Sequence, residues 1–477
     1  MKKQKFALHW QILIALTLAV IYGIIFPNNY RVTLKSYKHI IEKSSKVQLP
    51  NEVLLNIEKL IGNKDISKKN ILTEISSNTS VKLTESQEKF ILDNTKFNPP
   101  IKYVSWMGII FLKALKMLII PLILMSIISG IANIGSAGNL GRLGLKTLLY
   151  YLMTSTIAII IGLFLVNIIK PGAGLDRAYA TNVDLPEQIS HSLSDTLLNI
   201  IPENIFTALV ENQMLSVIFF AILFGFFITR INSKSRVILT DFFNASFEVM
   251  MKITMFIIIF TPFGVFGLVT EIVAEQSGKL TEFFNILGLY ALTVLVALFI
   301  HAAIILPLLL KFIAKVNPWA HFKAMRAALL TAFSTSSSGA TLSLTMESVE
   351  HNSGVSNKIS GFTLPLGATI NMDGTALYEA VAALFIAQVY GFDLGIMQQV
   401  IIVITALLVS IGAAGIPMAG LFMITIILTA VDLPLAGIAL ILPIDRILDM
   451  FRTSVNVWSD SCGAVIVAKT EGESLKI

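Results

Sequence analysis

Charged residues are scarce in this chain, because only 14% of its 477 residues are Asp, Glu, Lys or Arg while 55% are hydrophobic. Soluble domains carry about 25% charged residues, so this composition excludes an ordinary soluble fold and indicates a protein that crosses the membrane several times. The single cysteine, Cys462, excludes an internal disulfide. The six histidines lack the spacing of a metal site, and we attribute the net charge of +6 to cytoplasmic loops rather than to nucleic-acid binding.

Lys2, Lys3 and Lys5 lie close to the start of the chain and precede an apolar run from about residue 10 to residue 26. No small-residue cleavage site precedes Pro27, so the run predicts a retained helix rather than a signal peptide. The basic start places the N-terminus in the cytoplasm.

Residues 28–102 are polar and contain 13 Lys or Arg against 8 Asp or Glu. A basic loop is typically cytoplasmic, but that preference fades for loops longer than about 60 residues. We therefore expect an extracytoplasmic loop. The apolar positions between Val53 and Ile61 predict one short amphipathic helix in it, and we assign the loop no function.

Five further apolar runs follow before residue 318. They cover about 104–134, 148–169, 199–231, 242–273 and 287–312, with interruptions in the third and a kink at Pro262 in the fourth. Basic and acidic loops alternate between them, which supports six spanning helices including the first. His301 stands alone in the last of these runs, and we expect it to be packed or to face a pore rather than to bind an ion.

The pattern changes after residue 318. A serine-rich segment, 334–339, interrupts one apolar stretch, and a glycine-rich segment, 412–417, interrupts another. The arms on either side are too short to cross a bilayer, so each stretch predicts two half-helices in a re-entrant hairpin. Each hairpin precedes a long helix, and this repetition is expected of a transporter core whose site lies at the interrupted segments.

The first of these long helices contains the polar stretch from Asn371 to Thr375 inside an apolar run from about 362 to 389. A charge at the centre of a spanning helix costs about 2.5–3.5 kcal/mol on insertion scales. A structural kink satisfied by neighbouring helices is one interpretation. We favour an opened helix whose carbonyl groups and carboxylate hold a cation, because further polar interruptions follow in the chain.

The last helix, expected from about 435 to 467, carries one polar stripe at intervals of three or four residues. Its members are Asp445, Asp449, Arg452, Thr453, Asn456 and Asp460. A structural ion pair would not require the amide, the hydroxyl and a further acid on the same face. Arginine binds carboxylates through two parallel hydrogen bonds, and a carboxylate beside an amide suits Na⁺.

Together these motifs resemble the glutamate/aspartate transporter family of dicarboxylate/amino acid:cation symporters over about residues 104–470. The resemblance rests on four segments: 334–341, 371–375, 412–420 and 449–460. It implies an all-α membrane protein with eight transmembrane helices and two re-entrant helical hairpins arranged as inverted repeats. It also implies a homotrimer in which a moving transport domain slides against a scaffold, as an elevator does.

The implied organisation divides the chain into four parts. Residues 1–27 form the N-terminus and first helix, and residues 28–102 the extracytoplasmic loop. Residues 103–317 form helices two to six, mainly the trimerisation scaffold, although the third and sixth belong with the transport domain. Residues 318–477 form the transport core of hairpin 1, helix seven, hairpin 2 and helix eight.

The resemblance also implies the residues of a substrate site. Arg452 is expected to hold the side-chain carboxylate of an acidic amino acid and Asp449 its amino group. Thr375, Thr453 and Asn456 complete the pocket with the backbone of Ser338, Ile416 and Gly420.

Three sodium sites are implied in the same way. The first takes the backbone of Gly367, Asn371 and Asn456 with the carboxylate of Asp460. The second takes Thr369, Met372, Ser410, Ile411 and Ala413. The third takes Tyr151, Thr154, Ser155, Asn371 and Asp373. Sodium enters these sites as a transported ion, and no bound cofactor is expected.

Glu379 is expected to carry a proton, because proton-coupled members of the family resemble this chain in having glutamate there and burial disfavours a charged carboxylate. The chain departs from the family in having Ser336 and Met450 where a second arginine usually stands. That departure leaves potassium countertransport open. Trp458 and Ser459 also replace smaller residues.

The main interpretation is therefore a Na⁺-coupled carrier of glutamate or aspartate in the inner (plasma) membrane, with both termini in the cytoplasm and no enzymatic activity. A C4-dicarboxylate or neutral amino acid:cation symporter of the same fold is the alternative. An intramembrane serine hydrolase using Ser336, Ser337 or Ser338 lacks a nearby general base in the sequence. An anion channel remains a further alternative, since some family members also conduct anions.

Overall fold

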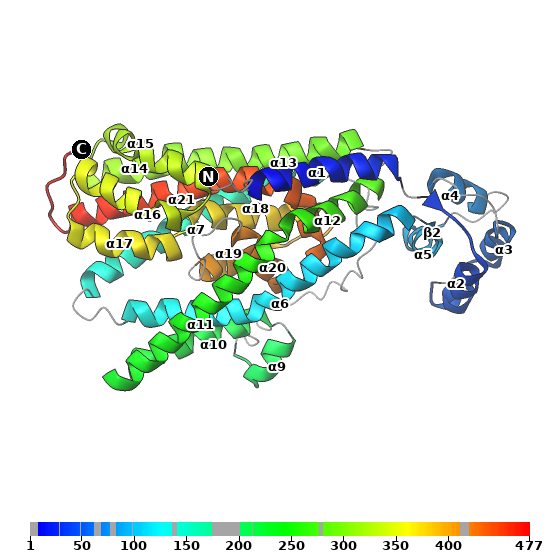
Figure 1. Cartoon of the computed structure of the whole chain (residues 1–477), viewed down its shortest axis with the longest axis horizontal. Coiled ribbons are helices and arrows are strands. Elements are labelled where there is room, and N and C mark those ends of the chain that lie inside the picture. Colours follow the sequence, from blue (N-terminus) through cyan, green and yellow to red (C-terminus); the bar gives the residue numbers. More distant parts are fainter. Residues whose placement is uncertain are drawn as a thin grey trace, which may run out of the picture. The chain divides into compact units, whose positions relative to one another are not determined.

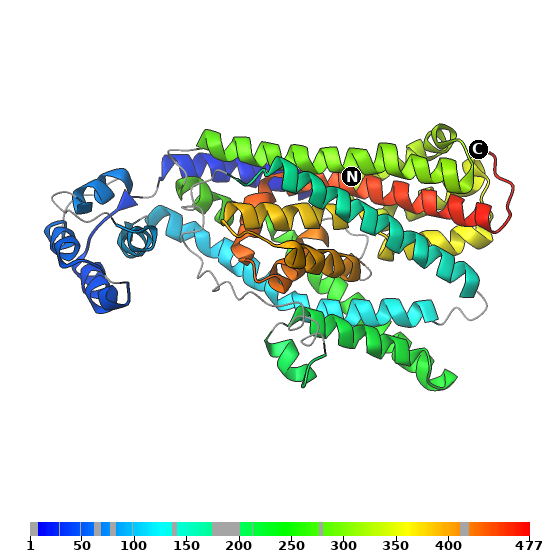
Figure 2. The same cartoon turned by 180° about the vertical axis from the view of Figure 1, so that it is seen from behind.

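The computed structural model of this chain describes residues 8–27, 29–47, 49–61, 68–76, 83–97, 99–135, 141–173, 201–211, 213–275, 280–410 and 419–477. These residues are helical almost throughout, and two short strands pair in an antiparallel sheet (Figures 1 and 2). The predicted all-α class is confirmed. The described residues fall into two compact units, each considered by itself below.

The first unit contains the described residues up to Leu112 and those from Phe260 to Phe284. Its elements are α1 (Leu8–Ile25), β1 (Asn29–Tyr30), α2 (Leu34–Val47), α3 (Asn51–Lys59), α4 (Lys68–Ser76), α5 (Glu85–Thr95), β2 (Lys96–Phe97), the beginning of α6 (Pro99–Gly135), α12 (Thr261–Glu275) and the beginning of α13 (Leu280–Ile300).

The second unit contains the described residues of three segments: Lys113–Ala173, Leu185–Ile259 and Asn285–Ile477. It begins with the rest of α6, α7 (Gly141–Ile169), α9 (Ile205–Val210), α10 (Met214–Ile228) and α11 (Ser233–Ile259). After α13 come a π-helical turn (His301–Ile305), α14 (Leu306–Leu309), a second π-helical turn (Leu310–Ala314), α15 (Pro318–Thr335), α16 (Ser338–Glu347) and a third π-helical turn (Ser348–Ser353). The last elements are α17 (Asn357–Ile370), α18 (Asp373–Val389), α19 (Ile396–Ser410), α20 (Ala419–Ala430), a 3₁₀ turn (Leu435–Gly437) and α21 (Ile438–Thr470).

Within the described residues, five segments are long and apolar enough to cross a membrane. They are Pro100–Asn133, Arg142–Ile169, Ser233–Ile259, Phe284–Ala314 and Asn357–Val389. Shorter apolar helices accompany them, including Trp10–Ile25, Ser216–Ile228, Thr261–Ala274 and Ile396–Ser410. Within the described residues, the apolar runs recognised in the sequence are therefore mostly helical.

In the first unit, α12 packs along α1 and crosses α6 at very short range. A Cβ atom placed on Gly267 would lie 2.5 Å from the backbone nitrogen of Gly108. Only glycine allows two backbones to approach so closely, which is how small residues hold helices together in a bilayer. The hydroxyl group of Tyr22 on α1 also donates a hydrogen bond to the carbonyl oxygen of Pro100.

The polar insertion after α1 is more structured than the sequence predicts. One short helix was expected, whereas the structure has four, α2 to α5, which gather beyond the ends of α1 and α6 in both views (Figures 1 and 2). Isoleucines 40, 57, 71, 75 and 91 are fully buried in a common hydrophobic core. Lys96 forms an ion pair with Glu271 of α12 at 3.7 Å, which fastens the insertion to the helices of its own unit.

In the second unit, α21 is the element around which the others pack. It contacts α7, α15, α16, α17 and α18. The side chains of α18 are almost all buried, because this helix is covered by α7, α19, α20 and α21. Asp373 and Glu379 of α18 and Arg452 and Asp460 of α21 are thus buried inside this unit.

The two interrupted stretches form helix pairs in the described residues. Helices α15 and α16 pack on each other and meet at Ser336 and Ser337, where Ser336 takes a left-handed backbone conformation with φ of 51°. Helices α19 and α20 also pack on each other. The glycine-rich segment expected at their tip, 411–418, lies outside the described residues.

The extent of one helix predicted from the sequence is wrong. The run 242–273 was expected as one helix kinked at Pro262, but α11 begins earlier, at Ser233, and the chain breaks at Phe260 before α12. Proline is accepted in the first turn of a helix, so Pro262 begins α12 rather than bending a continuous helix.

Candidate functional site

The chain leaves helical geometry at Asn371 and Met372, between α17 and α18. Their φ and ψ angles are −101° and 90° and −118° and 59°. The interruption predicted for this stretch is confirmed. Helix ends present carbonyl oxygens from one side and N–H groups from the other, and here both lie inside the packed unit.

The side chain of Asn456 on α21 accepts hydrogen bonds from the free backbone N–H groups at the beginning of α18. Its Oδ1 atom accepts hydrogen bonds from the backbone N–H groups of Gly374 at 2.8 Å and Thr375 at 3.3 Å, and its Nδ2 group donates to Thr375 Oγ1 at 3.0 Å. A Cβ atom on Gly374 would lie 2.6 Å from the carbonyl oxygen of Arg452. The first turn of α18 is thus held against the polar stripe of α21.

Asp460 lies beside the end of α17. Asn371 Nδ2 donates to Asp460 Oδ1 at 2.9 Å. A Cβ atom on Gly367 would stand 2.5 Å from that same carboxylate oxygen and 2.7 Å from Tyr151 Oη, so this position needs glycine. The structure therefore brings together Gly367, Asn371 and Asp460, with Asn456 one helical turn earlier on α21.

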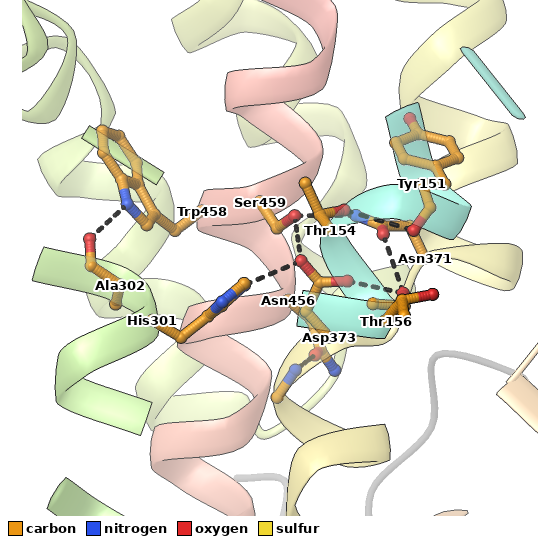
Figure 3. Close-up of polar contacts among 12 residues, drawn as sticks. Tyr151, Thr154, Thr156, His301, Ala302, Asn371, Asp373, Asn456, Trp458 and Ser459 are labelled. Atoms are coloured by element: carbon orange, nitrogen blue, oxygen red, sulfur yellow. Dashed lines mark hydrogen bonds and ion pairs between the residues drawn. The ribbon is translucent and has the colours of Figure 1, made fainter. Parts of the chain in front are cut away.

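Asp373 is fully buried and has three polar neighbours from three different elements. Ser155 Oγ of α7 donates to its Oδ1 atom at 2.6 Å, and Ser459 Oγ of α21 donates to its Oδ2 atom at 2.6 Å. His301 Nε2, from the first π-helical turn, lies 2.9 Å from the same Oδ2 atom. Figure 3 shows the side chains of His301, Asp373 and Ser459 beside α21.

The other members of the third predicted sodium set come from α7 and from the break before α18. Ser155 Oγ is also 3.5 Å from Asn371 Oδ1. The hydroxyl group of Thr154 donates to carbonyl groups of its own helix, and Tyr151 Oη donates to the carbonyl oxygen of Thr363 at 2.8 Å. All five members of this set are buried and come from one region of the unit.

The second predicted sodium set is assembled only in part. Met372 is buried in a hydrophobic cluster with Val409, which precedes Ser410 at the end of α19. Thr369 is exposed, and its hydroxyl group donates to carbonyl groups of α17. Ile411 and Ala413 lie outside the described residues.

The polar stripe predicted on α21 is present and buried. Its members Asp445, Asp449, Arg452, Thr453, Asn456 and Asp460 are all at most 5% exposed. Arg452 Nη2 lies 3.1 Å from Asp445 Oδ1 and 2.9 Å from Asp449 Oδ1. Its guanidinium carbon stands 3.7 Å from the centroid of the Tyr378 ring, an aromatic contact that helps a buried cation.

Two hydrogen-bond donors of Arg452 are available for a ligand. Its Nε and Nη1 atoms have no hydrogen-bond partner in the part of the chain that the structure describes, although the side chain is fully buried. A Cβ atom on Gly420 of α20 would lie 2.8 Å from Nη1. A buried guanidinium group with free donors is suited to hold an incoming carboxylate, because an unpaired buried donor is costly.

A second arginine at this place was missed in the sequence. Arg446 Nη1 lies 3.2 Å from Asp449 Oδ2, and the Arg446 side chain is 16% exposed. The spacing of three residues on one helix could have suggested the pair. Arg446 therefore adds a positive charge one helical turn before Met450 on α21.

The other predicted substrate residues lie at helix beginnings or on α21. Ser338 is buried in the first turn of α16, a helix that contacts α21. Thr375 is buried in the first turn of α18, and Thr453 is buried on α21. Gly420 lies beside Arg452, as described above, whereas Ile416 lies outside the described residues.

Glu379 is fully buried one turn beyond Thr375 on α18. Neither of its carboxyl oxygens has a hydrogen-bond partner among the described residues. A charged carboxylate without partners in such surroundings is far more costly than the neutral acid.

Comparison with known proteins places this geometry in a family. Residues 8–470 match the Sodium:dicarboxylate symporter family. The chain is 38% identical over 425 residues to excitatory amino acid transporter 3 of Homo sapiens, which covers 78% of this chain and 80% of that relative. It is 36% identical over 389 residues to the proton/sodium-glutamate symport protein of Geobacillus stearothermophilus, covering 79% of this chain and 90% of the relative.

A nematode relative shows the same level of similarity. The excitatory amino acid transporter of Caenorhabditis elegans is 36% identical over 430 residues, which cover 79% of this chain and 84% of the relative. The family match spans nearly the whole chain and includes every element that contributes to the buried polar site. This chain belongs to the sodium:dicarboxylate symporter family.

Proposed function

We propose that this protein is a secondary active transporter of the plasma membrane that carries acidic amino acids, glutamate or aspartate, together with Na⁺. The observation that carries the proposal is the buried guanidinium group of Arg452, which has free donors at Nε and Nη1 and stands next to Asp449. Relatives of this protein are named as glutamate and excitatory amino acid transporters, and these names agree with a site for an amino acid that bears a second carboxylate.

In the proposed site, the side-chain carboxylate of the substrate binds Arg452 and the ammonium group binds Asp449. Thr375, Thr453 and Asn456 supply the surrounding polar groups. The α-carboxylate lies at the beginning of α16, near Ser338, where backbone N–H groups and the helix dipole favour an anion. Gly420 and Ile416 contribute backbone groups from the second helix pair.

Sodium ions occupy three proposed sites as transported ions. Na⁺ is a hard cation that prefers oxygen ligands, and the described residues present oxygens at two places. One is formed by Asp460 with Gly367, Asn371 and Asn456. The other is formed by Asp373, Asn371 and Ser155, with Tyr151 and Thr154.

The third proposed sodium site combines Thr369, Met372 and Ser410 with Ile411 and Ala413 of the second helix pair. Met372 and the end of α19 already pack together, which supports this grouping. Binding there would join the second helix pair to the break between α17 and α18, so sodium would influence whether the pair closes over the substrate.

Glu379 is the proposed proton carrier. Its two unpartnered oxygens support a carboxyl group that crosses the membrane in its neutral form. Proton-coupled transport agrees with the name of the Geobacillus relative, a proton/sodium-glutamate symport protein. Potassium countertransport stays open.

The proposed architecture has eight transmembrane helices and two re-entrant hairpins, namely α15 with α16 and α19 with α20. Residues 318–477 form the transport core, which moves against a scaffold drawn mainly from 103–317 in a homotrimer. Alternating access by an elevator motion follows from this division. We place both termini in the cytoplasm and the 28–102 insertion outside.

A C4-dicarboxylate carrier and a neutral amino acid carrier are the alternatives within this fold. The first does not need Asp449 for an ammonium group, and the second does not need Arg452 for a second carboxylate. A hydrolase that uses Ser336, Ser337 or Ser338 is set aside, because the family is one of symporters.

The experiment that decides among these carriers is uptake by the purified protein in liposomes with an inward Na⁺ gradient. The labelled panel contains aspartate, glutamate, succinate and serine. The proposal expects aspartate or glutamate to accumulate and the other two to be poor substrates. Accumulation of succinate or serine in preference to both acidic amino acids would overturn it.

A further inference from the structure

We infer that His301 is a positioning residue for the sodium site at Asp373 and that Trp458 holds His301 in place. The inference rests on the proposed function, because it assigns roles around one of the proposed ion sites. It starts from a bond between two side chains that are both fully buried, His301 Nε2 and Asp373 Oδ2 at 2.9 Å (Figure 3).

The proton on the imidazole ring can be placed from the surroundings. His301 Nδ1 is buried and has no hydrogen-bond partner among the described residues, whereas Nε2 faces a carboxylate oxygen. A proton on Nδ1 would be a buried donor without an acceptor and would leave two lone pairs facing each other at Nε2. The proton on Nε2 is therefore donated in a hydrogen bond to Asp373 Oδ2.

The two oxygens of Asp373 differ in their partners. Among the described residues, Oδ2 accepts from His301 and Ser459, while Oδ1 accepts from Ser155 alone. The Ser155 hydroxyl group can turn its proton away and offer a lone pair, because hydroxyl hydrogens rotate freely. Oδ1, Ser155 Oγ and Asn371 Oδ1 are then three oxygens that face a cation together. His301 and Ser459 fix the carboxylate orientation that makes this possible.

The direction of the His301 side chain depends on local backbone geometry. His301 begins a π-helical turn, His301–Ile305, inside an otherwise α-helical segment. Such turns insert one extra residue, which rotates side chains and is frequent at functional sites. The apolar run 287–312 alone would not show which way His301 points.

Trp458 forms a hydrogen bond with this π-helical turn. Its Nε1 group donates to the carbonyl oxygen of Ala302 at 3.0 Å, and the tryptophan is 4% exposed (Figure 3). A carbonyl group released from regular helical pairing needs another donor, and the indole supplies it. Trp458 and Ser459 are consecutive residues of α21. Ser459 supports Asp373 directly, whereas Trp458 supports it through His301.

The test measures sodium binding apart from transport. The melting temperature of the purified full-length protein is recorded against Na⁺ concentration at constant ionic strength with choline, since an ion that binds the folded protein raises it. Labelled aspartate binding at saturating Na⁺ is measured in parallel. The variants are His301→Leu, His301→Gln, which keeps a donor, Trp458→Phe, and the control Trp319→Phe at a position 61% exposed.

Removing a residue that orients a metal ligand typically weakens metal affinity roughly 10- to 100-fold. We expect His301→Leu to raise the half-saturating Na⁺ concentration by about tenfold or more, with aspartate affinity at saturating Na⁺ changed less than about threefold. His301→Gln should recover most of the loss, Trp458→Phe should give a smaller increase, and Trp319→Phe should give none. Trp458→Phe should add nothing in the His301→Leu background, because it acts through the histidine.

An unchanged Na⁺ dependence in His301→Leu would overturn the inference, as would equal losses in the Leu and Gln variants. Full additivity of His301→Leu and Trp458→Phe would overturn the part concerning Trp458. If His301→Leu does not fold, Trp458→Phe carries the test, and wild-type Na⁺ affinity in that variant would contradict the inference. Absence of any Na⁺ effect in the wild-type protein would instead refute the proposed function.

Discussion

Arg446 Nη1 lies 3.2 Å from Asp449 Oδ2, and Arg452 Nη2 lies 2.9 Å from Asp449 Oδ1. Each oxygen of this carboxylate thus faces a different arginine. Asp449 is the proposed partner of the substrate's ammonium group, so an entering amino acid competes with Arg446 for it. A substrate without an amino group meets no such competition.

Arg446→Gln should therefore favour amino acids over dicarboxylates. The pair is partly exposed, so its contribution is about 1 kcal/mol or less, or up to about fivefold in the affinity ratio of aspartate to succinate. Competition binding with both ligands measures that ratio. Arg326→Gln, at an exposed arginine of α15, is the matched control. A ratio that stays at the wild-type value in Arg446→Gln would contradict the competition.

Arg452→Cys should abolish uptake of acidic amino acids. The substrate carboxylate would lose its buried partner, a loss of about 2–5 kcal/mol, and Asp445 would lose its ion pair. Uptake of labelled glutamate, aspartate and serine checks this, and serine uptake is expected to be retained or gained. Wild-type uptake of glutamate and aspartate by this variant would disprove the assignment.

Much of the helical architecture could be predicted because hydrophobic runs and polar interruptions are local signals. The break at Asn371 and the stripe on α21 were both visible, since costly polar residues in an apolar run need a reason. The four insertion helices were not all visible. Isoleucines such as Ile40, Ile71 and Ile91 come from separate short helices, and their common core exists only in the folded chain.

The site shows a similar limit. Helical spacing placed Asp449 and Arg452 together, but the contact between Ser155 and Asp373 joins residues 218 positions apart and was expected only from family resemblance. Arg446 was overlooked although it lies on the same helix. The bond from His301 to Asp373 was also missed, because an extra residue in the π-helical turn decides where His301 points.

Glu379→Gln should separate proton movement from substrate movement. The wild-type carboxyl group is buried without partners, so it is expected to carry a proton with the substrate. Liposomes that contain a pH dye should acidify during wild-type uptake. The Gln variant should exchange substrate without acidification and with little pH dependence. Equal acidification by both proteins would make Glu379 structural.

Asp460→Asn should weaken sodium binding while leaving the surrounding contacts similar in size. Asp460 Oδ1 accepts from Asn371, and neutralising it removes a carboxylate from a proposed ion site. The half-saturating Na⁺ concentration for aspartate binding should rise at least severalfold, in keeping with the loss of a charged ligand. An unchanged Na⁺ titration would remove Asp460 from the sodium ligands.

Glu471 should contribute stability that depends on pH. It follows α21 and accepts hydrogen bonds from Lys146 and Arg142 of α7, both at 2.6 Å, and these contacts lower the pKa of its carboxyl group. A depressed folded-state pKa gives stability above the unfolded value of about 4.3 that is lost as the pH falls through the folded value.

The melting temperature of Glu471→Gln should therefore lie below that of the wild type at pH 7, and the difference should shrink as the pH falls below about 4. Glu473→Gln serves as a control for loss of a nearby carboxylate that contacts Ser356 instead. A difference that persists unchanged at low pH would show that the ion pairs are not its source.

The most direct test of the central claim is concentrative uptake driven by sodium alone. Purified protein in liposomes receives an inward Na⁺ gradient with labelled aspartate or glutamate outside, and in the matched sample choline replaces Na⁺. The account predicts accumulation above the external concentration with Na⁺, collapse of that accumulation when a sodium ionophore dissipates the gradient, and none with choline. Accumulation that persists undiminished in choline would contradict it.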